Sequence, residues 1–174
     1  MRTMATVAAA VLVGGCTFPQ VVPEALNTEF KPTGEVFMYD RSCGFDAVRV
    51  RSPHVNLAKR TDGSWGGVLN KEPIDVSVTD TTVRGVMFVL TREESSPGRL
   101  VITGQIKGVI YRFEFEEGIA RVRGARESLD FKTRSPIENG VAYGPMKSLQ
   151  LKGEAAAESP PWPQFAFALV AMFN

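Results

Sequence analysis

The sequence predicts an all-β fold: one antiparallel β-sandwich or barrel-like domain of about ten short strands. Three observations support this prediction. Apolar and polar residues alternate with a period of two in many short segments, and turn-forming residues recur between those segments. No stretch after residue 34 has the period of a convincing amphipathic helix. Many short strands with frequent turns are typical of layered or closed antiparallel sheets.

The clearest alternation surrounds Phe113. Tyr111, Phe113 and Phe115 alternate with charged residues, which predicts a strand with one apolar face. The same pattern predicts strands around four other pairs: Val48 and Val50, Ile74 and Val76, Leu129 and Phe131, and Leu149 and Leu151. Turn-forming residues occur at positions 61–63, 95–98, 117–118 and 138–140. These turns separate the expected strands.

Two segments, 83–90 and 165–173, are apolar without alternation. Strands that are covered on both faces have this composition, so we expect two central or covered strands there. Residues 155–158 have room for one helical turn before the prolines at 160, 161 and 163, which cannot continue a helix. Trp162 lies between these prolines, and we expect its ring to pack against the domain and fix the final strand.

The first sixteen residues, MRTMATVAAAVLVGGC, have the pattern of a secretory signal peptide. Arg2 precedes an uncharged run over 5–13, which is too short to span a bilayer. Leucine and valine followed by two glycines and Cys16 resemble the lipobox of bacterial lipoproteins, which are cut before the cysteine and acylated on it. The resemblance covers residues 1–16 and implies lipidation of Cys16. A signal peptide cut near Ala10, or a buried first helix, would explain the same residues.

The resemblance divides the chain into a signal peptide (1–15), a lipid-anchored tether (16–34) and a β-rich globular domain (35–174). Three prolines favour extended conformations in the tether, which would reach about 60 Å if fully extended. Alternatively, four apolar residues of the tether dock onto the domain and shorten that reach: Val21, Val22, Leu26 and Phe30. Thr17 stands where an aspartate retains many enterobacterial lipoproteins in the inner membrane. The resemblance therefore implies an outer-membrane anchor, with the domain in the periplasm or at the cell surface.

Acylation of Cys16 would leave Cys43 as the one free cysteine, so we expect no intramolecular disulfide and a buried Cys43 thiol. The chain carries 20 basic and 19 acidic residues, and loss of the signal peptide removes only Arg2 from that count. A nucleic-acid-binding protein would need a clustered basic excess, so we expect no nucleic-acid partner.

Little in the sequence indicates catalysis, and we predict no catalytic residue, metal or cofactor. His54 is the only histidine, and no Gly-x-Ser-x-Gly segment accompanies it. One histidine and one free cysteine cannot form a zinc site without several carboxylates. The glutamate groups 93–94 and 114–117 could serve a glycosidase. Nearby arginines explain them equally well as cross-strand ion pairs on a solvated face.

Trp65 is the best candidate binding residue. It follows Asp62 and Gly63 in a glycine-rich segment, where small neighbours would leave its ring open for stacking on a sugar. A role without a ligand, in which Trp65 folds back and plugs the end of the sheet, is nevertheless the interpretation that we favour for this residue.

These observations favour a membrane-anchored lipoprotein of the bacterial cell envelope. Its non-catalytic β-domain would act through protein contacts in an envelope assembly, by a sheet edge or a loop. The first alternative is a carbohydrate- or peptidoglycan-binding module that uses Trp65 and Asp62, with a glycan as partner. The second alternative is an envelope hydrolase.

Overall fold

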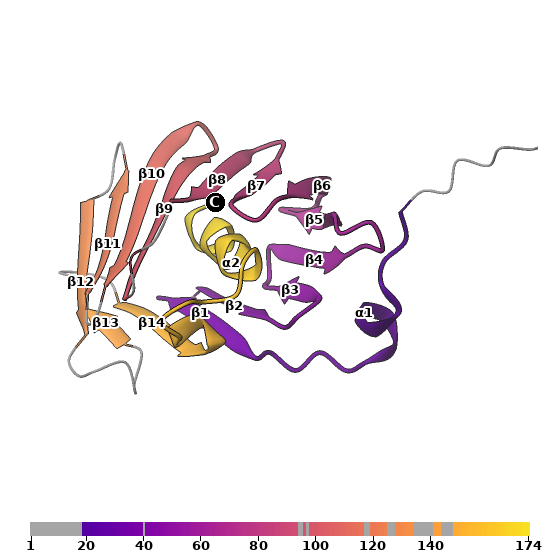
Figure 1. The fold of residues 1–174 in the computed structure, drawn as a ribbon, viewed down its shortest axis with the longest axis horizontal. Helices are drawn as coiled ribbons and strands as arrows, with labels where there is room; N and C mark the ends of the chain where they lie inside the picture. The colour runs from indigo at the N-terminus through magenta and orange to yellow at the C-terminus, as the bar shows by residue number, and fades with distance from the viewer. Residues whose placement is uncertain are drawn as a thin grey trace, which may run out of the picture.

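A computed structural model shows a closed antiparallel β-barrel with a helix inside it (Figure 1). The structure describes residues 19–39, 41–93, 96, 98–116, 119–124, 128–133, 141–143 and 148–174. Within them, fourteen strands each pair with their neighbours in sequence, and the first pairs with the last to close the ring. The all-β prediction is confirmed. The architecture is a barrel rather than a sandwich, and it contains more strands than expected.

The strands are β1 (Gly34–Met38), β2 (Arg41–Phe45), β3 (Arg49–Arg51), β4 (Val55–Lys59), β5 (Trp65–Leu69), β6 (Glu72–Val78), β7 (Thr82–Gly85), β8 (Phe88–Arg92), β9 (Arg99–Ile106), β10 (Val109–Glu116), β11 (Ile119–Gly124), β12 (Ser128–Thr133), β13 (Val141–Tyr143) and β14 (Ser148–Gly153). The helices are α1 (Pro23–Asn27), the 3₁₀ turn η2 (Glu154–Ala156) and α2 (Gln164–Phe173). Among the described residues, no helix is long and apolar enough to cross a membrane.

Period-two alternation predicted the barrel wall correctly. In β10, Tyr111 and Phe113 are buried while Arg112 and Glu114 are partly exposed. The other alternating segments correspond to β3, β6, β12 and β14. Most turn signals, at 95–98, 117–118 and 138–140, fall largely or wholly outside the described residues. The signal at 61–63 does form a turn between β4 and β5.

The predicted strand over residues 83–90 is wrong, because this segment is a hairpin. Val83 in β7 pairs with Leu90 in β8, and both side chains are fully buried. Val86 lies in the turn between the two strands and is 91% exposed. Because the turn residue Val86 is apolar, the sequence pattern does not indicate where the first strand ends and the second begins.

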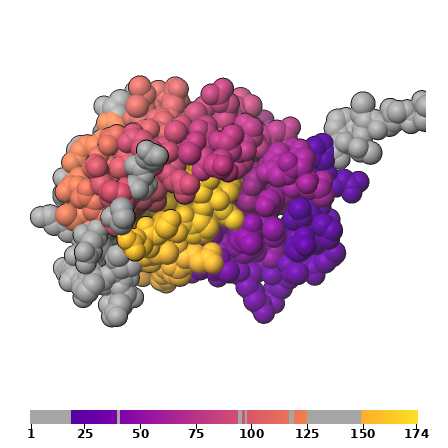
Figure 2. Space-filling view, viewed as in Figure 1, coloured from indigo at the N-terminus to yellow at the C-terminus, as the bar shows by residue number. Residues whose placement is uncertain are grey.

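The predicted final strand over residues 165–173 is also wrong: it is the helix α2. Nine of its ten residues are buried, because the barrel wall surrounds the helix on all sides. Phe167 lies 5.2 Å from Trp65 between ring centroids, and Phe173 lies 5.1 Å from Phe113. A helix that is apolar all round has no amphipathic period. Figure 2 shows the yellow C-terminal residues between the magenta and purple strands.

The segment before α2 confirms two smaller expectations. Residues 154–156 form the one helical turn η2. The Trp162 ring packs against the core, its Nε1 donates a hydrogen bond to the Thr79 carbonyl oxygen (3.0 Å), and the Arg92 guanidinium lies 5.6 Å from the ring centroid. Trp162 therefore fixes the entry of a helix, where the sequence predicted the entry of a strand.

Candidate functional site

The described part of the tether, residues 19–33, is docked on the barrel (Figure 1). Val21 forms a β-bridge with Arg60, just after β4. The amide of Val22 donates to the Lys59 carbonyl (3.0 Å), and the amide of Thr61 donates to the Gln20 carbonyl (2.9 Å). The expectation of an extended tether is thus wrong for these residues, and the docked alternative is correct.

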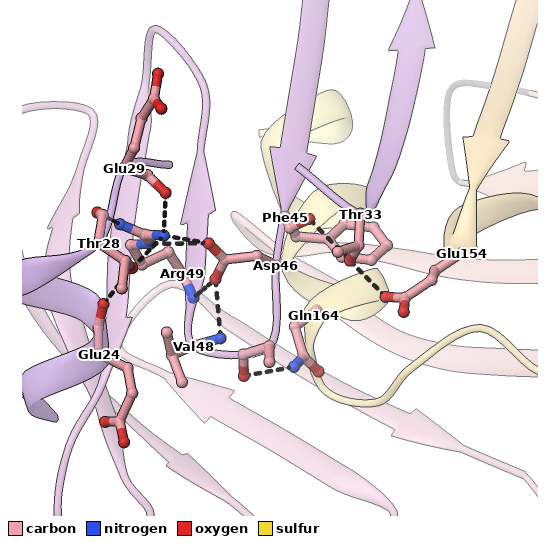
Figure 3. A network of polar contacts seen from close by, with 11 residues as sticks. Glu24, Thr28, Glu29, Thr33, Phe45, Asp46, Val48, Arg49, Glu154 and Gln164 are labelled. Atoms are coloured by element: carbon pink, nitrogen blue, oxygen red, sulfur yellow. Dashed lines mark hydrogen bonds and ion pairs between the residues drawn. The ribbon is translucent and has the colours of Figure 1, made fainter. Parts of the chain in front are cut away.

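Arg49 holds the next part of this segment (Figure 3). Its guanidinium donates to the carbonyl oxygens of Thr28 (2.6 Å) and Glu29 (3.0 Å), and it pairs with Asp46 at 2.7 Å. The other Asp46 oxygen accepts hydrogen bonds from the backbone amides of Val48 and Arg49. Arg49 is only 4% exposed. Asp46 therefore compensates the buried charge, while the remaining donors of Arg49 bind the docked segment.

Phe30 and Thr33 complete the attachment. The Phe30 ring lies 5.3 Å from the Arg49 guanidinium and 5.0 Å from that of Arg51. Thr33 donates from its amide to the Phe45 carbonyl (2.8 Å) and from its hydroxyl to Glu154 (2.6 Å). The four apolar tether residues do not behave alike, since Leu26 remains 69% exposed. Polar contacts to the backbone are a major part of what holds the segment.

An open groove lies beside the point where this segment first meets the barrel. Its volume is about 700 Å³, and Pro19, Ser64, Ser77, Arg84 and Val86 are among the residues that line it. Arg60 also lines it, lies over Gly66 of β5 and pairs with Asp75 of β6. A side chain at Gly66 would clash with that guanidinium. The groove thus runs over the outer face of β5, β6 and β7.

Trp65 does not present an open ring to a ligand. Trp65 begins β5 with its ring inside the barrel, 1% exposed and against Phe167. The favoured interpretation, that the ring folds back as a plug, is confirmed. Asp62 lies in the exposed turn, where its carboxylate accepts hydrogen bonds from the Ser64 amide (3.0 Å) and hydroxyl (2.7 Å). The hydrogen bond from the Ser64 hydroxyl is the main cause that lowers the pKa of Asp62, and the bond from the Ser64 amide adds to it. The structure gives Asp62 a turn-forming role, and the Trp65 ring is not accessible beside it.

The glutamates of the glycosidase alternative lie in an ionic cluster on the outside of the barrel. Its members are Glu93, Arg99, Arg112, Glu114, Glu116 and Arg121. Glu114 contacts Arg112 at 2.7 Å, and the hydrogen bond to Arg112 holds the pKa of Glu114 below its usual range. The interpretation as cross-strand ion pairs is confirmed for these residues. Glu94 and Glu117 lie outside the described residues.

The remaining candidates have no partners for catalysis among the described residues. His54 is exposed in the turn between β3 and β4. No group of three or more histidine, cysteine, aspartate or glutamate residues in the described ranges could hold a metal ion. Cys43 is free and fully buried, as expected, and burial raises the pKa of its thiol to about 12. Cys16 and Thr17 lie outside the described residues.

The attachment through Arg49 and Asp46 has no counterpart in the sequence pattern. Arg49 stood in the alternating pattern as an outward charged residue, and nothing in that pattern shows that a segment twenty residues earlier covers it. The chain matches no protein-family model, no curated protein and no solved structure.

Proposed function

We propose that this protein is a lipid-anchored lipoprotein of the bacterial cell envelope whose non-catalytic barrel acts through protein contacts in an envelope assembly. Acyl chains on Cys16 hold it at a membrane, with the outer membrane favoured by Thr17. The sequence pattern of residues 1–16 supports the anchor. The observation that carries the positional role is the docked segment, because Arg49 fixes the chain that leads to Cys16 against the barrel.

The filled interior supports contacts through the outside of the barrel. Helix α2 occupies the space in which a barrel of this kind would hold a ligand. Because β1 pairs with β14, the barrel has no free strand edge, and the expectation of a sheet edge as docking element does not apply. The turns and the outer faces of the strands remain for a partner. No arrangement of the described residues favours the glycan-binding or hydrolase alternatives.

Replacement of Cys16 tests the anchor. We expect the mature protein to carry diacyl or triacyl mass at its N-terminus and to fractionate with membranes. Cys16→Ser should lose both properties. Cys43→Ala is the matched control, since it removes the other cysteine and should leave acylation and fractionation unchanged. A water-soluble wild-type chain cleaved near Ala10 would contradict the proposal.

Crosslinking in the membrane fraction tests the protein partner. We expect one envelope protein to be crosslinked to the wild type and to be recovered much less with Cys16→Ser at equal expression. An exposed pair such as Arg112→Ala with Glu93→Ala probes whether the ionic cluster takes part, because these residues lie on the outside of the barrel. Absence of any crosslinked protein at cellular expression levels would count against an assembly role.

A further inference from the structure

We propose that the outer face of β5, β6 and β7 lies against the bilayer in which acylated Cys16 is anchored. This inference rests on the proposed lipidation and adds the orientation of the barrel. We call this surface the anchor face and define it by its outward residues: Val68, Pro73, Asp75, Ser77, Arg84 and Val86.

The small number of residues between Cys16 and the docked segment is the first argument. The Gln20 carbonyl already accepts a hydrogen bond from Thr61 at the rim of the barrel. Only four residue steps separate Cys16 from Gln20, and they span about 14 Å when fully extended. An acylated Cys16 lies at the level of the lipid headgroups. The barrel surface around Gln20 must then lie within that distance of the bilayer.

The groove gives the direction of contact. Pro19, the first described residue, lines the groove together with Arg84 and Val86. The described chain therefore begins, at Pro19, beside the anchor face. Small residues such as Ser77 and Gly85 line the groove together with Arg60 and Val86.

The chemistry of the anchor face matches the headgroup region of a bilayer. Val86 is 91% exposed and Val68 is 40% exposed, so two aliphatic side chains project from it. Arg84 forms no ion pair with any described residue, whereas the neighbouring Asp75 is matched by Arg60. A guanidinium without a carboxylate partner can donate two parallel hydrogen bonds to a lipid phosphate. The aliphatic side chains of Val68 and Val86 beside Arg84 can insert at the boundary between headgroups and acyl chains.

The ionic cluster provides the contrast. Its arginines and glutamates pair with one another on β9, β10 and β11 and at Glu93 just after β8. Figure 1 shows β10 and β11 on the other side of α2 from β5 and β6. A surface with its charges already paired gains little from lipid phosphates. In the proposed orientation the cluster is directed away from the anchor and toward the compartment that holds the protein partner.

Site-specific labelling of the mature lipoprotein tests the orientation. The Val86→Cys variant is labelled with an environment-sensitive fluorophore. It is then reconstituted into vesicles of phosphatidylethanolamine and phosphatidylglycerol. Cys43 should not react, because it is fully buried and its thiol is protonated. Lys152→Cys is the matched control, since it is exposed on β14, seven strands from β7 in the closed order. A third site, Leu26→Cys, tests whether α1 faces the bilayer instead.

We expect lipid-attached quenchers to quench the label at position 86 several-fold more than the label at 152. Aqueous iodide should show the reverse order. Equal exposure at 86 and 152, or stronger lipid quenching at 26 than at 86, would overturn the inference. The intact mass of each preparation separates the two proposals. Acylated protein with an exposed position 86 refutes the orientation alone, whereas protein without acyl chains refutes the anchor and the orientation together.

Discussion

The two terminal segments of the chain are held by different physical means. Helix α2 lies inside the barrel and is held by apolar burial, with Phe167 against Trp65 and Phe88. Residues 19–33 lie outside it and are held largely by hydrogen bonds, among them those from the buried Arg49 guanidinium and backbone bonds to Lys59 and Thr61. The inner segment is part of the core and therefore of the folding reaction. The outer segment lies between the barrel and the proposed anchor, and we expect that it can be released while the barrel stays folded.

The largest effect is expected inside the barrel. Phe167→Ala removes a fully buried ring from between Trp65 and Phe88, and we expect the free energy of unfolding to fall by about 4 kcal/mol. Phe37→Ala is the matched control, because Phe37 is a half-buried ring on the outer face, beneath Lys152. It should cost about 1 kcal/mol. Urea unfolding measures both, and equal losses would contradict the role of α2 as core.

The next effect concerns the attachment outside the barrel. Arg49→Met leaves Asp46 buried without its cation and removes the bonds to Thr28 and Glu29, so we expect a loss of about 3 kcal/mol. Limited proteolysis should also cut residues 19–33 faster while the barrel stays intact. Arg51→Met removes only one side of the Phe30 contact and should cost less than about 1 kcal/mol. Unchanged cleavage in Arg49→Met would show that other contacts suffice to hold the segment.

The buried thiol of Cys43 should make the free energy of unfolding depend on pH in the alkaline range. Burial raises the pKa of its thiol from 9.0 to about 12. Above pH 9 the unfolded chain loses the thiol proton while the folded chain keeps it, so stability falls as pH rises toward 12. This one group should lower the free energy of unfolding by about 1.4 kcal/mol at pH 10.

The control for this pH effect is Cys43→Ala, compared in a Cys16→Ser background so that no second thiol titrates. The variant should lose this part of the alkaline decline, measured by urea unfolding at pH 8 and pH 10. Identical declines in the two proteins would mean that the thiol is accessible to water in the folded state.

Local alternation was enough to predict the wall of the barrel. Residues such as Tyr111 and Phe113 point inward because successive side chains of a strand take opposite faces, and no distant contact changes that. The ionic cluster was predictable for the same reason, since Glu114 and Arg112 share one outward face. In both cases the period-two alternation predicts whether a side chain lies on the inner or the outer face of the barrel wall.

The elements that the sequence predicted wrongly depend on contacts between residues far apart in the chain. Local alternation carries no information about such contacts. Helix α2 is apolar all round because the wall encloses it, and its composition equals that of a covered strand. Trp65 lay among glycines that looked like a loop, yet its ring is required inside against Phe167. Arg49 looked like a solvent-facing charge because the segment that covers it lies twenty residues away. Closure of the barrel and docking of its ends are long-range events.

The smallest expected effect lies on the outer ionic cluster. Glu114→Gln keeps the shape of the side chain and removes a charge shared by Arg99, Arg112 and Arg121. Because solvent screens this partly exposed face, we expect a loss of only about 0.5 kcal/mol, which should vanish in 1 M salt. The lowered pKa of Glu114 means that the same contribution is present above the ordinary glutamate pKa and is lost as pH falls through the folded value. Urea unfolding at low and high salt measures it. A loss comparable to that of Phe167→Ala would show that the outside of the barrel, as well as its interior, determines whether the chain folds.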